Sequence, residues 1–140
     1  NGLGSMGYAL PGAMAARMAH PDRPCVAFVG DGGFLMSVAE LQTSVAEKLP
    51  VICIVFDDAE IGLIRVKQQL KQIPKFGVEV GGLHWDKMAQ GFGADGAVVT
   101  NEQELEAALK AALASGRTTV IGAKIDGSGY VEQFNALREL

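Results

Sequence analysis

The sequence predicts an α/β fold, a three-layer α/β/α domain built on a parallel, Rossmann-like sheet. Two observations predict this fold. Apolar runs of strand length alternate along the chain with segments of helical period, which is typical of a parallel sheet covered by helices. The runs are also almost continuously apolar, as expected of strands that are buried on both faces.

The predicted strands and helices alternate in the order that such a fold requires. The strands are expected at residues 25–29, 51–56, 97–99 and 119–125. The helices are expected at residues 10–19, 36–49, 85–91, 102–114 and 130–140, with a surface loop at 72–82. The helix at 102–114 has the clearest ends, because Asn101 and Glu104 have the spacing of a helix N-cap and Gly116 supplies a stop.

The composition excludes several classes of protein. The 12 Lys and Arg against 16 Asp and Glu give a net charge of −4, whereas binding to nucleic acid needs a concentrated basic face. No uncharged apolar run approaches the ~20 residues that cross a bilayer. Cys25 and Cys53 lie in apolar runs and are expected to be buried thiols. We therefore expect a cytoplasmic protein that contacts neither nucleic acid nor membrane.

The 140 residues are expected to form one domain. No internal repeat or domain-scale linker interrupts them. The chain starts with Asn-Gly and has no initiator Met, so we expect residues 1–140 to be an excerpt of a longer multidomain chain.

A glycine-rich turn follows the first predicted strand, at the edge where open parallel sheets bind ligands. The turn comprises Gly30, Asp31, Gly32 and Gly33. Gly32 and Gly33 permit main-chain N–H groups to approach a phosphate, and a helix expected near Met36 presents its positive end to the same place. Asp31 beside a phosphate implies a divalent cation between them, and Mg²⁺ is the expected one. The alternative is a plain strand-to-helix turn in which Asp31 caps the helix.

A pair of acidic residues follows the second predicted strand. Asp58 lies 27 residues after Asp31, which leaves room for the one helix and one strand of a right-handed crossover. That crossover brings the two strand ends together, so we expect oxygen ligands from both at one edge of the sheet. Asp57 and Asp58 point in different directions on an extended chain, so one is expected to ligate a cation and the other to serve the structure. The alternative is that these acids cap a helix that begins near Gly62.

A further glycine pattern opens the chain. Gly2, Gly4 and Gly7 have the spacing of the dinucleotide-binding fingerprint, and Asp31 stands where that fingerprint needs an acid. Only Asn1 precedes the pattern, whereas a true fingerprint follows a strand. A NAD-dependent oxidoreductase that uses the loop from Gly2 to Gly7 is therefore an alternative function.

The glycine turn and the acidic pair together resemble the thiamine diphosphate motif, in which Gly-Asp-Gly is followed, one helix and one strand later, by Asn-Asn. Segments 2–11, 40–43 and 49–51 are similar to the branch that contains acetolactate (acetohydroxyacid) synthases, pyruvate oxidase and 2-oxo acid decarboxylases. The resemblance covers essentially all 140 residues. It corresponds to the C-terminal, diphosphate-binding domain of such an enzyme.

The resemblance implies a role for each matching residue. Asp31 and Asp58 would bind Mg²⁺ with their carboxylates, and Glu60 would bind it with its main-chain carbonyl. The Gly4 carbonyl would accept a hydrogen bond from the aminopyrimidine of the cofactor, and Met6 would hold the cofactor in a bent form. The other residues implied to contact thiamine diphosphate are Gly30, Gly32, Gly33, Ile61, Gly62, Leu63 and Ile64.

The resemblance also implies an activity and partners. The activity is thiamine diphosphate- and Mg²⁺-dependent decarboxylation of a 2-oxo acid with transfer of the acyl carbanion equivalent, as in an acetolactate synthase-like carboligase. No catalytic side chain is expected in this chain, because the activating Glu of the family lies on a pyrimidine-binding domain, usually of a neighbouring subunit. A homodimer or homotetramer is therefore expected, and FAD is compatible with the full-length enzyme.

Two departures from the family pattern are visible. Asp57 and Asp58 replace the usual Asn-Asn and put extra negative charge beside an anionic diphosphate. The aromatic residue that acetohydroxyacid synthases carry a few positions later is replaced near Val66 and Lys67. A degenerate, non-catalytic domain that keeps the fold is the alternative that these departures leave open.

Overall fold

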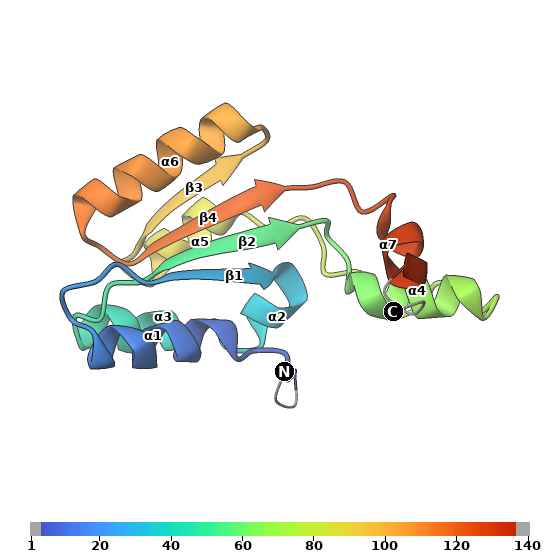
Figure 1. Cartoon of the computed structure of the whole chain (residues 1–140), viewed down its shortest axis with the longest axis horizontal. Helices are drawn as coiled ribbons and strands as arrows, with labels where there is room; N and C mark the ends of the chain where they lie inside the picture. The colour runs from blue at the N-terminus through green and yellow to red at the C-terminus, as the bar shows by residue number, and fades with distance from the viewer. Residues whose placement is uncertain (1–3, 137–140) are drawn as a thin grey trace.

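Helices cover both faces of a parallel sheet in the computed structural model, which describes residues 4–136 (Figure 1). The predicted three-layer α/β/α fold is therefore confirmed. In chain order the elements are α1 (Ala9–Ala19), β1 (Val26–Gly30), α2 (Asp31–Leu35), α3 (Glu40–Ala46), β2 (Ile52–Asp57), α4 (Gly62–Leu70), α5 (Trp85–Gly91), β3 (Asp95–Val99), α6 (Glu102–Ser115), β4 (Thr119–Lys124) and α7 (Tyr130–Ala136).

The four strands are parallel and lie in the order β1-β2-β4-β3. β2 and β4 occupy the centre of the sheet, and they are buried almost throughout because helices pack on both of their faces. All four carboxyl ends meet at one edge of the sheet. β1 and β2 are neighbours there, so the ends that carry Asp31 and Asp58 lie side by side, as the sequence spacing predicts.

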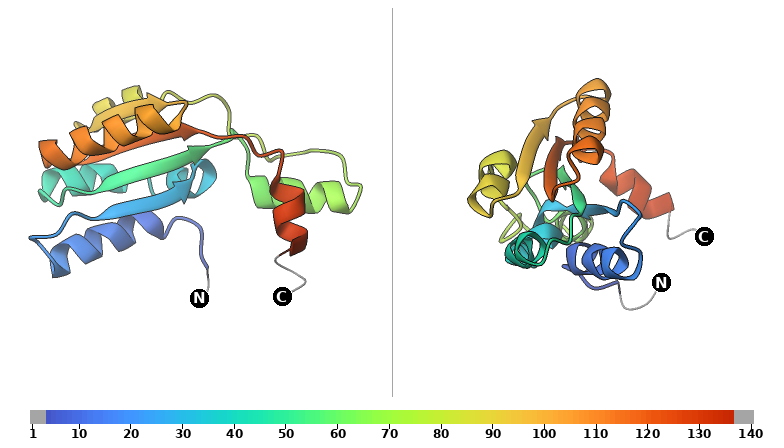
Figure 2. Two further views of the ribbon diagram at one scale, coloured as in Figure 1. Left: turned by 45° about the horizontal axis from the view of Figure 1, so that its top comes forward. Right: turned by 90° about the vertical axis from the view of Figure 1, so that its left-hand side faces the viewer.

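The larger part of the core lies between the sheet and the helices α1, α2, α3 and α5 (Figure 2). Its largest helical side chains are Leu10, Phe34, Leu41 and Trp85, one from each of these helices. Trp85 lies on β4, where a Cβ built on Gly122 would be only 2.2 Å from its Cδ1 atom. Gly122 therefore makes the room that the indole ring needs.

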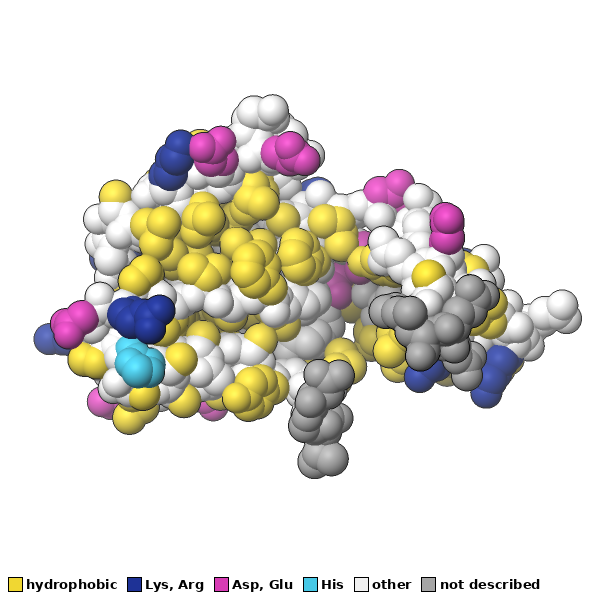
Figure 3. Space-filling model, viewed as in Figure 1, with side chains coloured by type: hydrophobic (Ala, Val, Ile, Leu, Met, Phe, Trp, Pro, Cys, Tyr) yellow, Lys and Arg dark blue, Asp and Glu magenta, His cyan; other side chains and the backbone are white. Residues whose placement is uncertain are grey.

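The opposite face of the sheet is only partly covered. Ala112 of α6 packs there on Ile54 and Ile121, in the half of the face over β2, β3 and β4. On the β1 side the face is open, and Phe28 is 63% exposed. Its ring stacks on that of the 37% exposed Phe56, with ring centroids 6.0 Å apart. Figure 3 shows hydrophobic side chains gathered over the strands on this face, below α6.

The structure corrects the predicted start of the helix after β1. We expected a helix near Met36 to present its positive end to Gly32 and Gly33. These glycines instead lie inside α2, a helix of five residues that begins at Asp31. The extended backbone of Gly30 forms the N-cap, so the helical turn starts directly after the strand.

The predicted helix at 36–49 is shorter than expected. Residues 36–39 form successive turns, in which the N–H groups of Ser37 and Glu40 bond to carbonyls three residues earlier. The α-helix proper is α3 alone. Such turns keep apolar side chains on one side of the chain, so the apolar period extends further than the helix does.

The predicted ends of α6 are confirmed. The Oδ1 atom of Asn101 accepts a hydrogen bond from the N–H of Glu104 at 2.9 Å, and Gly116 adopts the left-handed conformation with φ 62°. The Glu104 carboxylate reaches back to the N–H of Thr100 at 2.8 Å. This bond lowers the pKa of Glu104 below its ordinary value.

The prediction for the long loop holds, and that for the cysteines holds for Cys53, whereas Cys25 is only partly buried. Cys25 and Cys53 are free, and burial raises the pKa of the Cys53 thiol to about 12. Residues 72–82 contain neither helix nor strand, apart from one bridge residue, Glu79. In the described part of the chain, residues 4–136, every helix is too short or too polar to cross a membrane.

Candidate functional site

A cavity of about 530 Å³ opens at the carboxyl edge of the sheet. It is lined by the segment before α1, by the ends of β1 and β2, and by α4 and α7, which lie side by side beyond the strands (Figure 1). Ten of the twelve residues that the sequence nominates as cofactor contacts line it, namely Met6, Gly30, Asp31, Gly32, Gly33, Asp58, Glu60, Ile61, Gly62 and Leu63. Gly4 and Ile64 are outside the lining.

Asp31 is the buried acid of this cavity. It directly follows β1, is 2% exposed, and accepts a hydrogen bond at Oδ1 from the N–H of Gly32 at 2.6 Å. Its Oδ2 atom is also buried and has no hydrogen-bond partner among the described residues. Burial raises the pKa of Asp31, and the negative charges of Asp58 and Asp57 add to that rise. A buried carboxylate oxygen without a partner is costly, so this side chain fits the role of a cation ligand.

Asp58 brings a second carboxylate to the cavity from the neighbouring strand end. Its Oδ1 atom accepts a weak hydrogen bond from the N–H of Glu60 at 3.4 Å. Asp57 diverges from it, as the extended backbone predicts. Asp57 is 2% exposed, is absent from the cavity lining, and bonds to Trp85 and Lys124.

The turn after β2 has an unusual backbone conformation. Ala59 has φ 61°, in the left-handed region that residues with a Cβ seldom adopt. Its N–H donates to Oδ1 of Asp57 at 3.2 Å, which holds the turn in place. The helix α4 that follows has no side-chain cap, so the alternative in which the acids only cap this helix is wrong.

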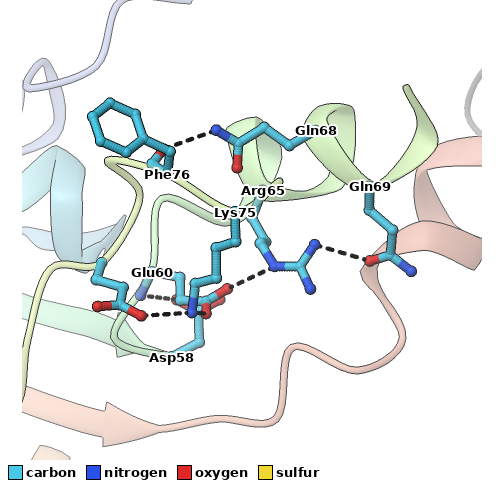
Figure 4. Close-up of polar contacts among 8 residues, drawn as sticks. Asp58, Glu60, Arg65, Gln68, Gln69, Lys75 and Phe76 are labelled. Carbon is cyan, nitrogen blue, oxygen red and sulfur yellow. Dashed lines mark hydrogen bonds and ion pairs between the residues drawn. The ribbon is translucent and has the colours of Figure 1, made fainter. Parts of the chain in front are cut away.

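The loop at 72–82 folds back onto this turn. The N–H of Ile61 donates to the carbonyl of Val78 at 2.8 Å. The Glu60 carboxylate forms ion pairs with Lys75 and, at 3.7 Å, with Arg65 (Figure 4). Because Lys75 and Arg65 hold the carboxylate, Glu60 can bind a metal ion in the cavity only through its main-chain carbonyl.

The rest of the cavity wall is mainly apolar. Met6, Ile61, Leu63 and Val66 contribute side chains to it. A Cβ on Gly32 would lie 3.2 Å from Cγ1 of Ile61 and 3.6 Å from Cε of Met6, so these two side chains close over the glycine. The cavity therefore has an acidic end at Asp31 and an apolar flank.

The helix α7 contributes to the cavity, and nothing in the sequence indicates this. Tyr130, Gln133 and Phe134 of this helix line the cavity, and α7 packs against α4. Burial raises the pKa of the Tyr130 hydroxyl, and the negative charge of Asp58 adds to the rise. The sequence predicts a helix at residues 130–140, but nothing in the spacing of its apolar residues indicates what it packs against.

The acidic end of the cavity offers a cation two carboxylates. Within residues 4–136 no three His, Cys, Asp or Glu side chains are grouped as a complete metal site. Asp31 and Asp58 are hard oxygen donors of the kind that Mg²⁺ prefers, and Mg²⁺ usually completes its shell with water, phosphate or carbonyl oxygens. The geometry is thus suited to a cation that joins the protein to an anionic ligand.

The glycine pattern at the start of the chain is only partly described by the structure, because Gly2 lies outside the described residues.

Comparisons with known proteins agree with the resemblance. Residues 1–123 match the model of the thiamine pyrophosphate enzyme, C-terminal TPP binding domain. The catabolic acetolactate synthase of Raoultella terrigena is 35% identical over 126 residues, which are 90% of this chain and 22% of that protein.

Two solved structures share the fold. The thiamine diphosphate-dependent 4-hydroxybenzoylformate decarboxylase of Rhodococcus jostii RHA1 superposes with a TM-score of 0.80 at 28% identity, over 88% of this chain and 24% of that one. The benzoylformate decarboxylase of Polynucleobacter necessarius gives 0.76 at 30% identity, over 90% of this chain and 25% of that one. The chain spans between a fifth and a quarter of the length of these relatives.

Proposed function

This chain belongs to the thiamine pyrophosphate enzymes, as a C-terminal TPP-binding domain, and we propose that its cavity holds the diphosphate end of thiamine diphosphate through Mg²⁺. The observation that carries the proposal is the buried, unpartnered Oδ2 atom of Asp31. It lines the same cavity as Asp58, at two neighbouring strand ends. A divalent cation at that position satisfies an oxygen that the described protein leaves without a partner.

The proposed ligands are those that the sequence nominates. Asp31 and Asp58 bind the cation with carboxylate oxygens, and Glu60 binds it through its main-chain carbonyl. The side chain of Glu60 is unsuited to the task because Lys75 and Arg65 already pair with it. The main chain at Gly32 and Gly33, in the first turn of α2 and in the cavity lining, is proposed to approach the diphosphate.

The apolar flank is proposed to hold the ring portion of the cofactor. Met6, Ile61 and Leu63 exclude water there and fix the orientation of the bound molecule. When bound, thiamine diphosphate supplies the carbanion chemistry by which such enzymes break or form a bond next to a carbonyl carbon. The residues of this chain bind, orient and desolvate it.

We further propose that the whole enzyme decarboxylates a 2-oxo acid and transfers the acyl unit to an acceptor. The names of the relatives support this class, since they include an acetolactate synthase and two decarboxylases of benzoylformate-type acids. Three acids line the described cavity: Asp31 and Asp58 are the proposed cation ligands, and the Glu60 carboxylate is paired with Lys75 and Arg65, so we assign none of them to the pyrimidine ring. We propose that the activating Glu comes from a pyrimidine-binding domain, and that the enzyme is an oligomer of at least two subunits.

Calorimetric titration of the intact protein with thiamine diphosphate tests the function, in Mg²⁺ and in excess EDTA. We expect binding only with Mg²⁺. Asp31→Asn should weaken that binding by more than about 100-fold, since changes behind the ligands alone cost ~10–100-fold in metal affinity. Asp22→Asn, at an exposed acid outside the cavity lining, is the matched control and should bind normally.

Other results would decide against this assignment. Cofactor binding that is equal in EDTA, or that survives Asp31→Asn, contradicts the metal site. Binding of NAD that ignores Mg²⁺ favours the dinucleotide alternative. If the folded protein binds neither thiamine diphosphate nor NAD, the result favours the degenerate, non-catalytic domain.

A further inference from the structure

Asp57 is a buried acid that the proposed function does not use. Along β2 it alternates with Phe56 and lies on the same face as Cys53 and Val55, beneath α5. It is 2% exposed, and its neighbour Asp58 points into the cavity instead. A carboxylate buried at the margin of a metal site needs a compensating partner, because an unpaired buried charge is strongly unfavourable.

Two donors converge on one oxygen of Asp57. Trp85 Nε1 and Lys124 Nζ each lie 2.5 Å from Oδ2. Lys124 is also the residue opposite Asp57 in the register of the parallel strands β2 and β4. Trp85 reaches Asp57 because Gly122, two residues before Lys124, leaves room for the indole on β4.

The other oxygen of Asp57 holds the turn that leads into the site. Oδ1 accepts the N–H of Ala59, the residue in the left-handed conformation. The chain neighbours of Ala59 are Asp58 and Glu60, and both line the cavity. The direction of the Asp58 side chain and of the Glu60 main chain therefore depends on how firmly Asp57 is held.

We propose that Lys124 and Trp85 are positioning residues of the cation site: they fix Asp57, and Lys124 offsets its charge, so that Asp58 presents most of the negative charge from this strand end to the cavity. This inference rests on the proposed function. It explains how the chain carries Asp57-Asp58 where the family pattern has two neutral amides. Lys124 offsets the charge of the first acid, so the second acid changes the charge at the metal more than the first does.

Charge-changing variants of the intact protein test this inference through the affinity for Mg²⁺ alone, measured by calorimetry without cofactor. Asp57→Asn leaves Lys124 without its counter-charge, so Mg²⁺ should bind about fivefold more weakly, the size expected of one unit charge acting across partly solvated protein. Lys124→Gln keeps a hydrogen-bond donor and frees the charge of Asp57, so Mg²⁺ should bind about fivefold more tightly. The double variant Asp57→Asn/Lys124→Gln should return to within about twofold of the wild-type affinity.

Two controls separate charge compensation from a merely structural role. Lys124→Arg keeps the charge and should bind Mg²⁺ as the wild type does. Lys110→Gln removes an exposed cation of α6 that pairs with Glu106, far from the cavity lining, and should leave the affinity unchanged. Trp85→Phe removes one of the two donors to Asp57 and keeps the aromatic packing, so it should weaken the binding of thiamine diphosphate. Combined with Asp57→Asn or Lys124→Gln, it should leave the direction of the change in Mg²⁺ affinity as it is in those single variants.

The results also separate this inference from the function on which it rests. Shifts of the same sign in Asp57→Asn and Lys124→Gln, or no shift in either, overturn the inference, as does a double variant that is no closer to wild type than the single ones. If the wild-type protein itself shows no Mg²⁺-dependent binding of thiamine diphosphate, the proposed function fails. Melting temperatures of the metal-free variants show which of them remain folded, and the comparison is made among those.

Discussion

The ring of Tyr130 occupies the space that a side chain on Gly62 would need. A Cβ on Gly62 would lie 2.6 Å from Cε2 of Tyr130 and 3.2 Å from Oδ2 of Asp58. This contact joins the start of α4 to the start of α7, the two helices that close the far side of the cavity. The absence of a side chain at position 62 is thus a requirement of the helix pair.

Gly62→Ala should therefore destabilise the protein, although alanine is the better helix former. Forcing a methyl group into this contact should cost about 1–3 kcal/mol in the free energy of unfolding, measured with urea. Tyr130→Ala in the same chain removes the obstacle and should recover most of the loss. Gly82→Ala, where no atom lies within 4 Å of the new methyl group, is the control and should be nearly neutral. A neutral Gly62→Ala would contradict the contact.

Gly122→Ala should have a larger effect. The new methyl group would lie 2.2 Å from Cδ1 of Trp85 in the middle of the core, where the neighbouring atoms are fully buried. We expect a loss of about 3 kcal/mol or more, because the indole has to leave both β4 and Asp57. Thermal unfolding of Gly122→Ala beside Gly91→Ala, at a helical glycine with open space around it, checks this. Equal melting temperatures of the two variants would disprove the packing argument.

Asp58→Asn should be tolerated by the proposed cofactor site. The amide keeps an oxygen for the cation and removes one negative charge from beside Asp31 and the diphosphate. At saturating Mg²⁺, thiamine diphosphate should bind equally well or up to about tenfold more tightly. Asp58→Ala removes the oxygen as well and should weaken binding. Complete loss of binding in Asp58→Asn would mean that the role assigned to this residue is wrong.

The cap of α6 should make stability depend on pH. The bond from Thr100 lowers the pKa of Glu104 in the folded state, so the carboxylate stabilises the fold above the pKa of the unfolded chain. This stabilisation is lost as the pH falls through the lower, folded pKa. Glu104→Gln should thus be less stable than the wild type at pH 7, and the difference should close as the pH falls below about 4.

Urea unfolding at pH 7 and at low pH measures that difference. Glu47→Gln, at an exposed acid after α3, is the control and should track the wild type at both pH values. A Glu104→Gln difference that stays constant with pH would show that the carboxylate acts through its shape rather than its charge.

The sequence contains enough information to predict the edge of the sheet at which the cavity lies. Asp31 and Asp58 each follow an apolar run, and in a parallel sheet such ends lie at one edge, where consecutive strands are usually neighbours. The resemblance then nominates the neighbouring residues. Ile64 shows the limit of that step, because it lies outside the cavity lining although it sits one residue after Leu63.

The partners of Asp57 could not be predicted in the same way. Trp85 and Lys124 are 28 and 67 residues away along the chain, and they reach Asp57 only because β4 lies between β2 and β3. Periodicity identifies the strands but does not state their order in the sheet. The start of α2 was missed for a related reason, since a helix of one turn is too short to show a period.

The stacked rings of Phe28 and Phe56 leave an exposed aromatic surface on the sheet, which affects how the protein behaves in solution. An open aromatic surface binds hydrophobic dyes and other copies of itself, and added sulfate strengthens such adhesion. The particle mass of the protein in solution is therefore expected to rise with its concentration and with added sulfate, as the exposed sheet faces of two copies associate. Such a rise reports association through the open sheet face and is not by itself a subunit stoichiometry.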